Sequence, residues 1–344
     1  MKLDFGAGPV PAHQHRNPNG SLGGWVADSA TVDDSVMINE SATVASGCTI
    51  NAHCSIGPDC EIGENCKIGQ HCVVSSLSSI GADCEIGDFV KIGSACEIGA
   101  RVKTDRRVKI GEYCKIEHGA RLETDCDLGP HVMVGRECRI AFGCRLGIRC
   151  RVGNRCRLGC QVVTQPNSAI GDDCNIADQC KIGQSAKIKS KCEIANLTEI
   201  GPSARIDEAC LIGGDCSIGR ACRVGRRSKI GYRCRISDNC RFAADTILDN
   251  LSCISGRGGE YDWTAWRARD GTVYLAFGCV REPLAVWRKR AAEYVERFEP
   301  RAAVEYRRLI RNIVAFAAAT IVPKRKNSKT KKPSAKKTKA KERI

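Results

Sequence analysis

Cysteine is the most frequent chemically reactive side chain in this sequence, and it recurs with a fixed spacing. Of the 24 cysteines, 21 lie on one six-residue beat between Cys48 and Cys240, as in CRLGIRCRVGNRCRLGC at residues 144–160. Only Cys160, Cys253 and Cys279 lie off the beat. Disulfide frameworks are irregular and typical of small secreted domains, and a zinc site needs a local cluster of ligands. The spacing therefore predicts reduced, buried thiols that pack as small hydrophobic side chains, and a cytoplasmic location.

Histidines are the candidate catalytic bases. His118 in KIEHGA and His131 in LGPHVM could each act as a general base that accepts a proton. His53 and His71 are separated by three hexads, but two histidines without a third ligand make a weak metal site. Because an exposed, solvated ring is the simpler interpretation of each, we predict no metal and assign no catalytic residue from the sequence.

Basic residues form a third group, in a chain of net charge +15. Residues 324–344 contain eleven lysines and arginines against Glu342 alone. Basic clusters of this kind attract nucleic acid and other polyanions without sequence preference, whereas few aromatic residues are available for base stacking. The candidate polyanion-binding residues are two series with a spacing of three hexads and part of the C-terminal run: Lys103, Arg121, Arg139 and Arg157; Lys187, Arg205, Arg223 and Arg241; Lys331, Lys332, Lys336 and Lys337.

A six-residue repeat must position all of these side chains. Between Val26 and Phe242, 34 of the 37 positions at steps of six are Val, Ile or Leu. A small residue precedes each of them by two positions, and glycine follows twenty times, as expected of a corner where a side chain would be costly. Residues two apart share one side of a strand. A single hexad cannot bury itself, so the hexads must stack as a β-solenoid.

The pattern of IGENCK at residues 62–67 resembles the hexapeptide-repeat superfamily over residues 24–243. The resemblance implies a mainly β fold, a single-stranded left-handed parallel β-helix of about twelve triangular coils, in which residues three hexads apart stack directly. It also implies a homotrimer, and acyl transfer from acetyl-CoA as the commonest activity. RNPNGSLGGWV at residues 16–26 and DGTVYLAFGC at residues 270–279 resemble an uncharacterised bacterial and phage branch often labelled as acetyltransferases.

The flanking segments complete the predicted domain organisation. Residues 1–23 are expected to lead into the β-helix, and residues 254–322 to form a hairpin around Asp270-Gly271 followed by helices at 283–298 and 301–321. This C-terminal α+β module either caps the solenoid or docks a protein partner. Residues 323–344 are expected to be a disordered basic tail. Neither a membrane span nor a signal peptide is predicted.

Two functions from different classes follow. The first is a noncatalytic, rod-like scaffold or binding protein, without a cofactor, that contacts nucleic acid or another polyanion. The alternative is an acyl-CoA-dependent acyltransferase with His118 or His131 as base and acetyl-CoA as acyl donor. The sequence favours the first because no loop interrupts the repeat, whereas acyltransferases of this superfamily often place such a loop beside the catalytic histidine.

Overall fold

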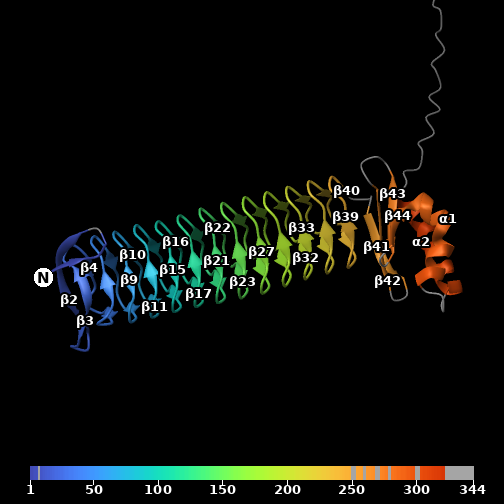
Figure 1. Ribbon diagram of the computed structural model, residues 1–344. Coiled ribbons are helices and arrows are strands. Elements are labelled where there is room, and N and C mark those ends of the chain that lie inside the picture. The colour runs from blue at the N-terminus through green and yellow to red at the C-terminus, as the bar shows by residue number, and fades with distance from the viewer. Residues whose placement is uncertain are drawn as a thin grey trace, which may run out of the picture.

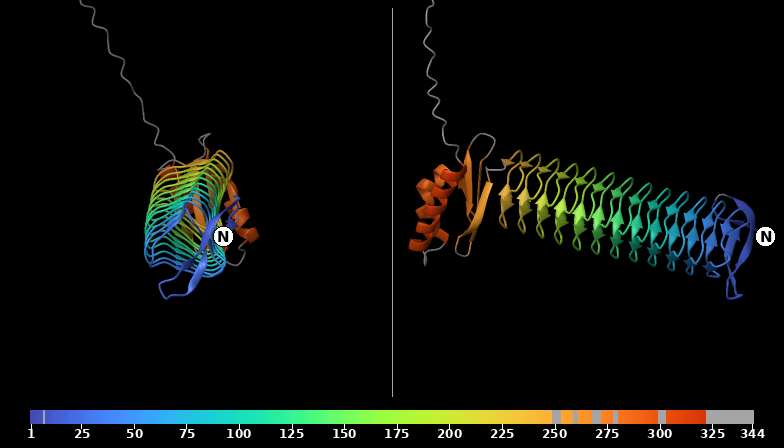
Figure 2. Two further views of the ribbon diagram at one scale, coloured as in Figure 1. Left: turned by 90° about the vertical axis from the view of Figure 1, so that its left-hand side faces the viewer. Right: turned by 180° about the vertical axis from the view of Figure 1, so that it is seen from behind.

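The protein is a long rod with a small module at its C-terminal end (Figure 1). The computed structural model describes residues 1–6, 8–248, 253–258, 261–267, 272–277, 280–298 and 303–321. The predicted disordered tail, including Lys331, Lys332, Lys336 and Lys337, lies outside these residues, as do Asp270 and Gly271. Seen along the rod, the coils superimpose into one outline (Figure 2), which confirms the predicted solenoid of about twelve coils.

Each hexad forms one two-residue strand, and every third strand joins the same parallel sheet. The first sheet contains β3 (Leu22–Ala27), β6 (Thr43–Val44), β9 (Glu61–Ile62), β12 (Ser79–Ile80), β15 (Glu97–Ile98), β18 (Lys115–Ile116), β21 (Met133–Val134), β24 (Arg151–Val152), β27 (Ala169–Ile170), β30 (Lys187–Ile188), β33 (Arg205–Ile206), β36 (Arg223–Val224) and β39 (Arg241–Phe242).

The second sheet contains β4 (Thr31–Val32), β7 (Thr49–Ile50), β10 (Lys67–Ile68), β13 (Glu85–Ile86), β16 (Lys103–Thr104), β19 (Arg121–Leu122), β22 (Arg139–Ile140), β25 (Arg157–Leu158), β28 (Asn175–Ile176), β31 (Glu193–Ile194), β34 (Leu211–Ile212), β37 (Lys229–Ile230) and β40 (Ile247–Leu248). The coil thus continues one hexad beyond Phe242, where the sequence analysis had ended it.

The third sheet contains β5 (Met37–Ile38), β8 (Ser55–Ile56), β11 (Val73–Val74), β14 (Lys91–Ile92), β17 (Lys109–Ile110), β20 (Asp127–Leu128), β23 (Arg145–Leu146), β26 (Val163–Thr164), β29 (Lys181–Ile182), β32 (Glu199–Ile200), β35 (Ser217–Ile218) and β38 (Arg235–Ile236). In all three sheets, the first residue of a two-residue strand faces outward and the second, almost always aliphatic, is buried, except that Val32 of β4 is half-buried.

Backbone hydrogen bonds join each coil to the next. The Lys67 amide donates to the Cys84 carbonyl at 2.8 Å, and the Gly69 amide donates to the Ile86 carbonyl at 2.7 Å. The accepting carbonyl belongs to the following coil in both cases, and the same offset along the chain repeats throughout the rod. Residues three hexads apart therefore pair in register, as Arg139 does with Arg157.

The corners depend on two different backbone requirements. Glycine after the aliphatic residue is needed for close approach, because a Cβ on Gly147 would lie 2.8 Å from the Pro166 nitrogen of the next coil. The left-handed conformation occurs two positions later, at Arg149 with φ 57°. It recurs on the six-residue beat from Gly47 to Asp245, and almost all of the side chains at these positions are larger than glycine. An L-residue in this conformation costs roughly 1 kcal/mol.

Hydrogen bonds offset the cost of these corners. The amide of a left-handed residue donates to a carbonyl of the preceding coil, as Asn65 does to Ser46 at 2.9 Å. Where the preceding coil is the first one, serine hydroxyls accept these bonds instead of carbonyls. The amides of Gly47, His53 and Asp59 donate to the Oγ atoms of Ser29, Ser35 and Ser41 at 3.2, 2.8 and 2.9 Å.

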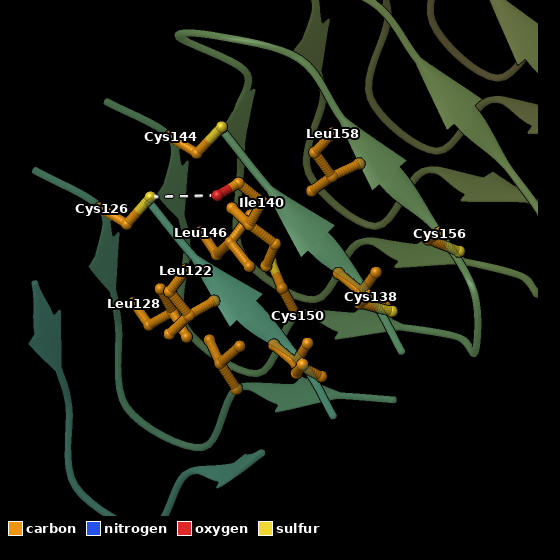
Figure 3. Packing of buried hydrophobic residues seen from close by; sticks show 14 of the residues in the cluster. Leu122, Cys126, Leu128, Cys138, Ile140, Cys144, Leu146, Cys150, Cys156 and Leu158 are labelled. Atoms are coloured by element: carbon orange, nitrogen blue, oxygen red, sulfur yellow. Dashed lines mark hydrogen bonds between the residues drawn. The ribbon is translucent and has the colours of Figure 1, made fainter. Parts of the chain in front are cut away.

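Stacked aliphatic side chains and thiols fill the interior (Figure 3). All 21 cysteines on the beat are at most 5% exposed, and the cysteines from Cys48 to Cys240, which include Cys160, are all free thiols. The Cys48 thiol donates to the Gly63 carbonyl of the next coil at 3.0 Å, and most of the other inward thiols make the same contact. Burial raises the pKa of Cys180 to about 11, which keeps this thiol protonated at neutral pH.

Different structures cover the two ends of the rod. At the N-terminus, the first sheet is extended by β2 (Pro9–Arg16), which pairs antiparallel with β3, and by β1 (Lys2–Asp4), which pairs antiparallel with β2. At the C-terminus, β41 (Cys253–Gly258), β42 (Tyr261–Arg267), β43 (Val273–Phe277) and β44 (Val280–Pro283) form an antiparallel sheet between the last coils and the helices α1 (Leu284–Phe298) and α2 (Ala303–Ile321) (Figure 1). The predicted hairpin corresponds to β42 and β43, within a larger sheet.

The C-terminal module packs directly on the last coil. The Trp266 ring meets the edge of Phe242 at 4.9 Å between centroids, and Trp266 is 1% exposed. The Arg281 guanidinium lies 5.0 Å from the centre of the Trp266 ring and donates from Nη1 to the Arg241 carbonyl at 2.7 Å. These contacts continue the hydrophobic core of the coils into the C-terminal sheet.

Thiol accessibility tests this core. Because the inward cysteines are buried and Cys160 is only partly buried, Cys160 should be the first cysteine on the β-helix to react with an alkylating reagent in the native protein. Unfolding should expose the rest. Mass spectrometry after timed labelling distinguishes the sites, with Cys160→Ala as control; rapid native labelling of most inward cysteines would contradict the assignment. Cys253 and Cys279, the other two cysteines off the beat, lie outside the residues whose burial is described.

A charge placed inside the coil should lower the free energy of unfolding far more than the loss of a charge on the outside. Cys150→Arg would bury an unpaired guanidinium beside the Ser168 hydroxyl, which lies 3.1 Å from the Cys150 thiol. We expect a loss of more than about 4 kcal/mol in unfolding free energy, measured by denaturant titration. The exposed neighbour Arg151→Ala should change stability by less than about 0.5 kcal/mol. Similar losses for both variants would argue against the inward position of Cys150.

Candidate functional site

The outward residues of the first sheet are here called the first face. The two candidate catalytic histidines lie at its two opposite edges. His131 lies at the corner immediately before β21, with φ 59°. His118 lies at the opposite corner, just after β18. The outward residues between the two edges over these coils are Lys115, Met133 and Arg151, which pair in register from strand to strand.

A groove of about 490 Å³ runs beside His131. The ring of His131 is exposed and stacks on the Tyr113 ring, with centroids 4.9 Å apart and planes 7° apart. Tyr113 occupies the same corner position one coil before His131, so the stack is a direct result of the repeat. The other residues lining the groove are Ala95, Glu97, Cys114, Lys115, Met133, Arg149 and Arg151.

Three cations border this groove, and only one of them is paired with a carboxylate in the described part of the chain. The Lys115 Nζ atom lies 2.7 Å from the Glu97 carboxylate, and this hydrogen bond raises the pKa of Lys115 above its usual value. Arg149 and Arg151 are exposed and form no ion pair within the described part of the chain. The groove therefore combines an imidazole, an apolar thioether and aromatic surface, and two guanidinium groups available to an anion.

His118 has a different environment. It is half-buried, its carbonyl accepts from the Glu137 amide at 3.0 Å, and it does not line the His131 groove. The neighbouring Glu117 is paired with Arg136 at 3.3 Å. The structure thus does not bring the two candidate histidines into one groove.

Both basic series stack in register, as their spacing of three hexads predicts. Lys103, Arg121, Arg139 and Arg157 follow one another on the second sheet. Lys187, Arg205, Arg223 and Arg241 do so on the first face. We call these two sets the second-sheet column and the first-face column.

Acidic residues neutralise part of the second-sheet column. Lys103 pairs with Glu85 at 2.9 Å and holds the pKa of that carboxyl below its usual value. Arg139 pairs with Glu123 at 2.6 Å. A wide groove of about 860 Å³ lies along the same column and includes Arg121 and Arg157.

The first-face column has no such compensation. Within the described residues, no carboxylate lies within ion-pair distance of Lys187, Arg205, Arg223 or Arg241. The two nearest acids in sequence have other partners, since Asp207 pairs with Lys189 at 2.8 Å and Glu208 with Arg226 at 3.6 Å. Four stacked cations at ~4.8 Å intervals repel one another, and an anionic ligand would relieve this repulsion.

Metal-site geometry is not found in the described part of the chain, where no three His, Cys, Asp or Glu side chains converge. His53 and His71 stack with ring centroids 4.9 Å apart, and His71 stacks in turn on Phe89. These rings form an exposed corner ladder. Neither helix of the described chain is long and apolar enough to cross a membrane.

Sequence analysis missed the residues that join His131 in its groove. Tyr113, Arg149 and Arg151 were not singled out, although the spacing of three hexads could have placed Tyr113 beneath His131 and Arg149 above it. It could not show that Ala95 and Met133 leave the surface hollow at this point, because groove shape depends on the side chains of several coils together.

Residues 32–118 match the family described as the GMPPB C-terminal domain. No curated protein sequence matches significantly. Among solved structures, the Francisella novicida UDP-N-acetylglucosamine acyltransferase is 14% identical with a TM-score of 0.29, covering 65% of this chain and 66% of that one.

Two further solved structures show the same range of similarity. The Arabidopsis UDP-N-acetylglucosamine acyltransferase is 14% identical with a TM-score of 0.22, covering 83% of this chain and 94% of that one. A Caulobacter crescentus perosamine N-acetyltransferase, in complex with CoA and GDP-perosamine, is 22% identical with a TM-score of 0.21, covering 39% and 49%. This chain therefore spans just under two thirds of the Francisella enzyme and half of the Caulobacter one.

The unbroken six-residue repeat, the three parallel sheets and their register of three hexads give the chain the architecture of a hexapeptide-repeat β-helix. Similarity at the identities given above concerns the coiled architecture alone.

Proposed function

We propose that the protein is an acyl-CoA-dependent acyltransferase whose active site is the His131 groove. The observation that carries this proposal is the presence of an exposed imidazole and two unpaired guanidinium groups in one groove beside apolar surface. Acyl transfer is also the activity most common in the superfamily. The absence of an inserted loop, which made the sequence favour a scaffold, counts less once the coil surface itself supplies a groove.

Each group has a defined role in the proposed reaction. The His131 imidazole would take the proton from an acceptor amine or hydroxyl as that group attacks the thioester carbonyl, and CoA would leave as its thiol. Arg149 and Arg151 would bind the phosphates of the acyl donor. Tyr113 holds the imidazole plane by stacking, and Met133 offers an apolar contact.

Acetyl transfer to a panel of amine and hydroxyl acceptors, followed by chromatographic detection of CoA, tests the proposal. His131→Asn should lower kcat by at least about 100-fold, in the range expected for loss of a general base, while acetyl-CoA binding persists. Arg151→Glu should mainly raise KM for acetyl-CoA. His118→Asn serves as the matched control, because His118 lies outside the groove. Transfer that survives His131→Asn, or no transfer to any acceptor, would count against this function.

A second candidate function is polyanion binding along the first-face column, and the lack of ion pairs there favours it. The fixed rise of these four cations would align a phosphate chain along the rod, and the eleven basic residues of the C-terminal run would add affinity without sequence preference. This retains the scaffold hypothesis, with nucleic acid as the first polyanion to test.

Binding to duplex DNA and RNA over a salt series separates the two contributions. Arg205→Glu with Arg223→Glu should weaken binding and reduce the slope of log affinity against log salt by about 2, since each phosphate contact contributes roughly 0.9. Lys91→Glu with Lys109→Glu, the same charge change on the third sheet, is the control. Truncation after Ile321 reports the contribution of the C-terminal run. Equal effects of the two double variants would remove the column from the binding site.

A further inference from the structure

The N-terminal end of the first face contains a groove that neither proposed function uses. Its volume is about 560 Å³, which is within the range of small-molecule sites. Residues 3–6, at the end of β1, line it together with the outward residues of four successive coils, which are Trp25, Thr43, Glu61 and Ser79. The N-terminal strands and the first coils thus meet at this groove.

Small residues leave room in the groove. Thr43 and Ser79 lie on either side of Glu61 in register, and Gly63 and Gly81 line the adjoining corner without a side chain. Among the coil residues that line the groove, only Trp25 and Glu61 have long outward side chains. The character of the groove therefore depends on these two residues and on the N-terminal segment.

Phe5 and Trp25 supply the aromatic surface. They are the only Phe, Trp or Tyr residues among residues 1–88, and both line this groove. Each is half-buried, so part of each side chain stays accessible. The face of an aromatic ring, and of tryptophan most strongly, attracts a cation.

Asp4 and Glu61 are the only charged residues that line the groove. The Asp4 Oδ1 atom accepts from the amides of Gly6 and Gly8 at 2.8 and 3.0 Å, which leaves Oδ2 without a partner in the described part of the chain. The Glu61 carboxylate has no ion pair among the described residues. Residues 1–100 contain 4 lysines and arginines against 12 aspartates and glutamates, so the surroundings also favour a cation.

The same face shows how a cation binds at an equivalent position. Two coils beyond Glu61, the Glu97 carboxylate accepts from the Lys115 Nζ atom at 2.7 Å, and Lys115 belongs to the next coil in register. At Glu61 the residue in that register position is Ser79, which has no charge. The ammonium group that satisfies Glu97 is therefore missing at Glu61, where a groove lies instead.

We propose that this groove binds the ammonium group of a small organic cation, with its charge between Asp4 and Glu61 and its alkyl groups against Phe5 and Trp25. The combination of carboxylates and aromatic faces is the chemistry that recognises an alkylammonium group. This site rests on neither proposed function, because acyl-CoA and nucleic acid are anionic and the two carboxylates would repel them.

Tryptophan fluorescence of the full chain tests the site directly. Trp263, Trp266 and Trp287 are at most 8% exposed, so a ligand in the groove should change mainly the emission of Trp25. Choline and butylamine, titrated at constant ionic strength, should each give a saturable change. The neutral analogue 3,3-dimethyl-1-butanol has the shape of choline without its charge and should bind at least about tenfold more weakly.

Variants assign the site to the named residues. Glu61→Gln should weaken choline binding at least about tenfold, since it removes a charge that contacts the ligand. Ser79→Lys reproduces the arrangement of Glu97 and Lys115, so its own ammonium group should occupy the groove and abolish binding. Trp25→Leu should weaken binding about fivefold or more, measured by titration calorimetry because the reporter ring is gone.

Glu64→Gln is the matched control, because it removes the same charge from the same coil but does not line the groove; its affinity should stay within about twofold of the unaltered protein. Circular dichroism checks that each variant is folded. Failure of both amines to bind at tens of millimolar, equal binding of the neutral analogue, or unchanged affinity in Glu61→Gln and Ser79→Lys would overturn the proposal. Loss of acetyl transfer or of DNA binding would leave it unaffected.

Discussion

Every feature of the rod depends on the backbone hydrogen bonds that connect a residue to the neighbouring coil. They hold each coil directly over the one before it, and so they convert spacing in the sequence into position on a face. The glycines allow this close approach, because any Cβ at those corners meets the backbone of the next coil, as at Gly147. The left-handed corner residues direct their amides back to the previous coil. Side-chain packing then only has to fill a channel of constant shape.

The thiols follow from that constant shape. The inward position two residues before the aliphatic accepts cysteine, alanine, serine, threonine or valine, and a thiol there is both small enough to fit and able to donate to a carbonyl of the next coil. Serine at position 78 makes the corresponding bond to the Gly93 carbonyl at 2.8 Å. The abundance of cysteine therefore needs no redox or metal chemistry to explain it.

Most of the fold was predictable from the sequence because one period governs most of the chain. The burial of Cys150 follows from counting, and the pairing of Arg139 with Arg157 follows from the three hexads per coil that the family resemblance implies. The corners were understood less well, since the sequence shows a glycine but not that Arg149 takes the left-handed conformation two positions later. The four-stranded C-terminal sheet was seen only as a hairpin, because its first and last strands have no repeat to mark them. Ion pairing was less predictable: the second-sheet and first-face columns look alike in sequence, and only the structure shows that Glu85 and Glu123 pair with two of the four cations of the second-sheet column.

Because the rod has three sheets, the number of hexads between two residues decides whether they lie on the same face. Loss of a complete coil, which is three hexads, would shorten the rod and leave every later side chain on its original face. Loss of a single hexad would also preserve inward and outward positions, so the solenoid could still close, but all later residues would move by one third of a turn. The first-face column would then emerge on a different side from His131 and from Glu61. In this architecture, a change of phase can therefore move a whole surface while every inward position keeps the same kind of residue. The unbroken phase from Val26 to Leu248 keeps the His131 groove and the first-face column on one side of the rod.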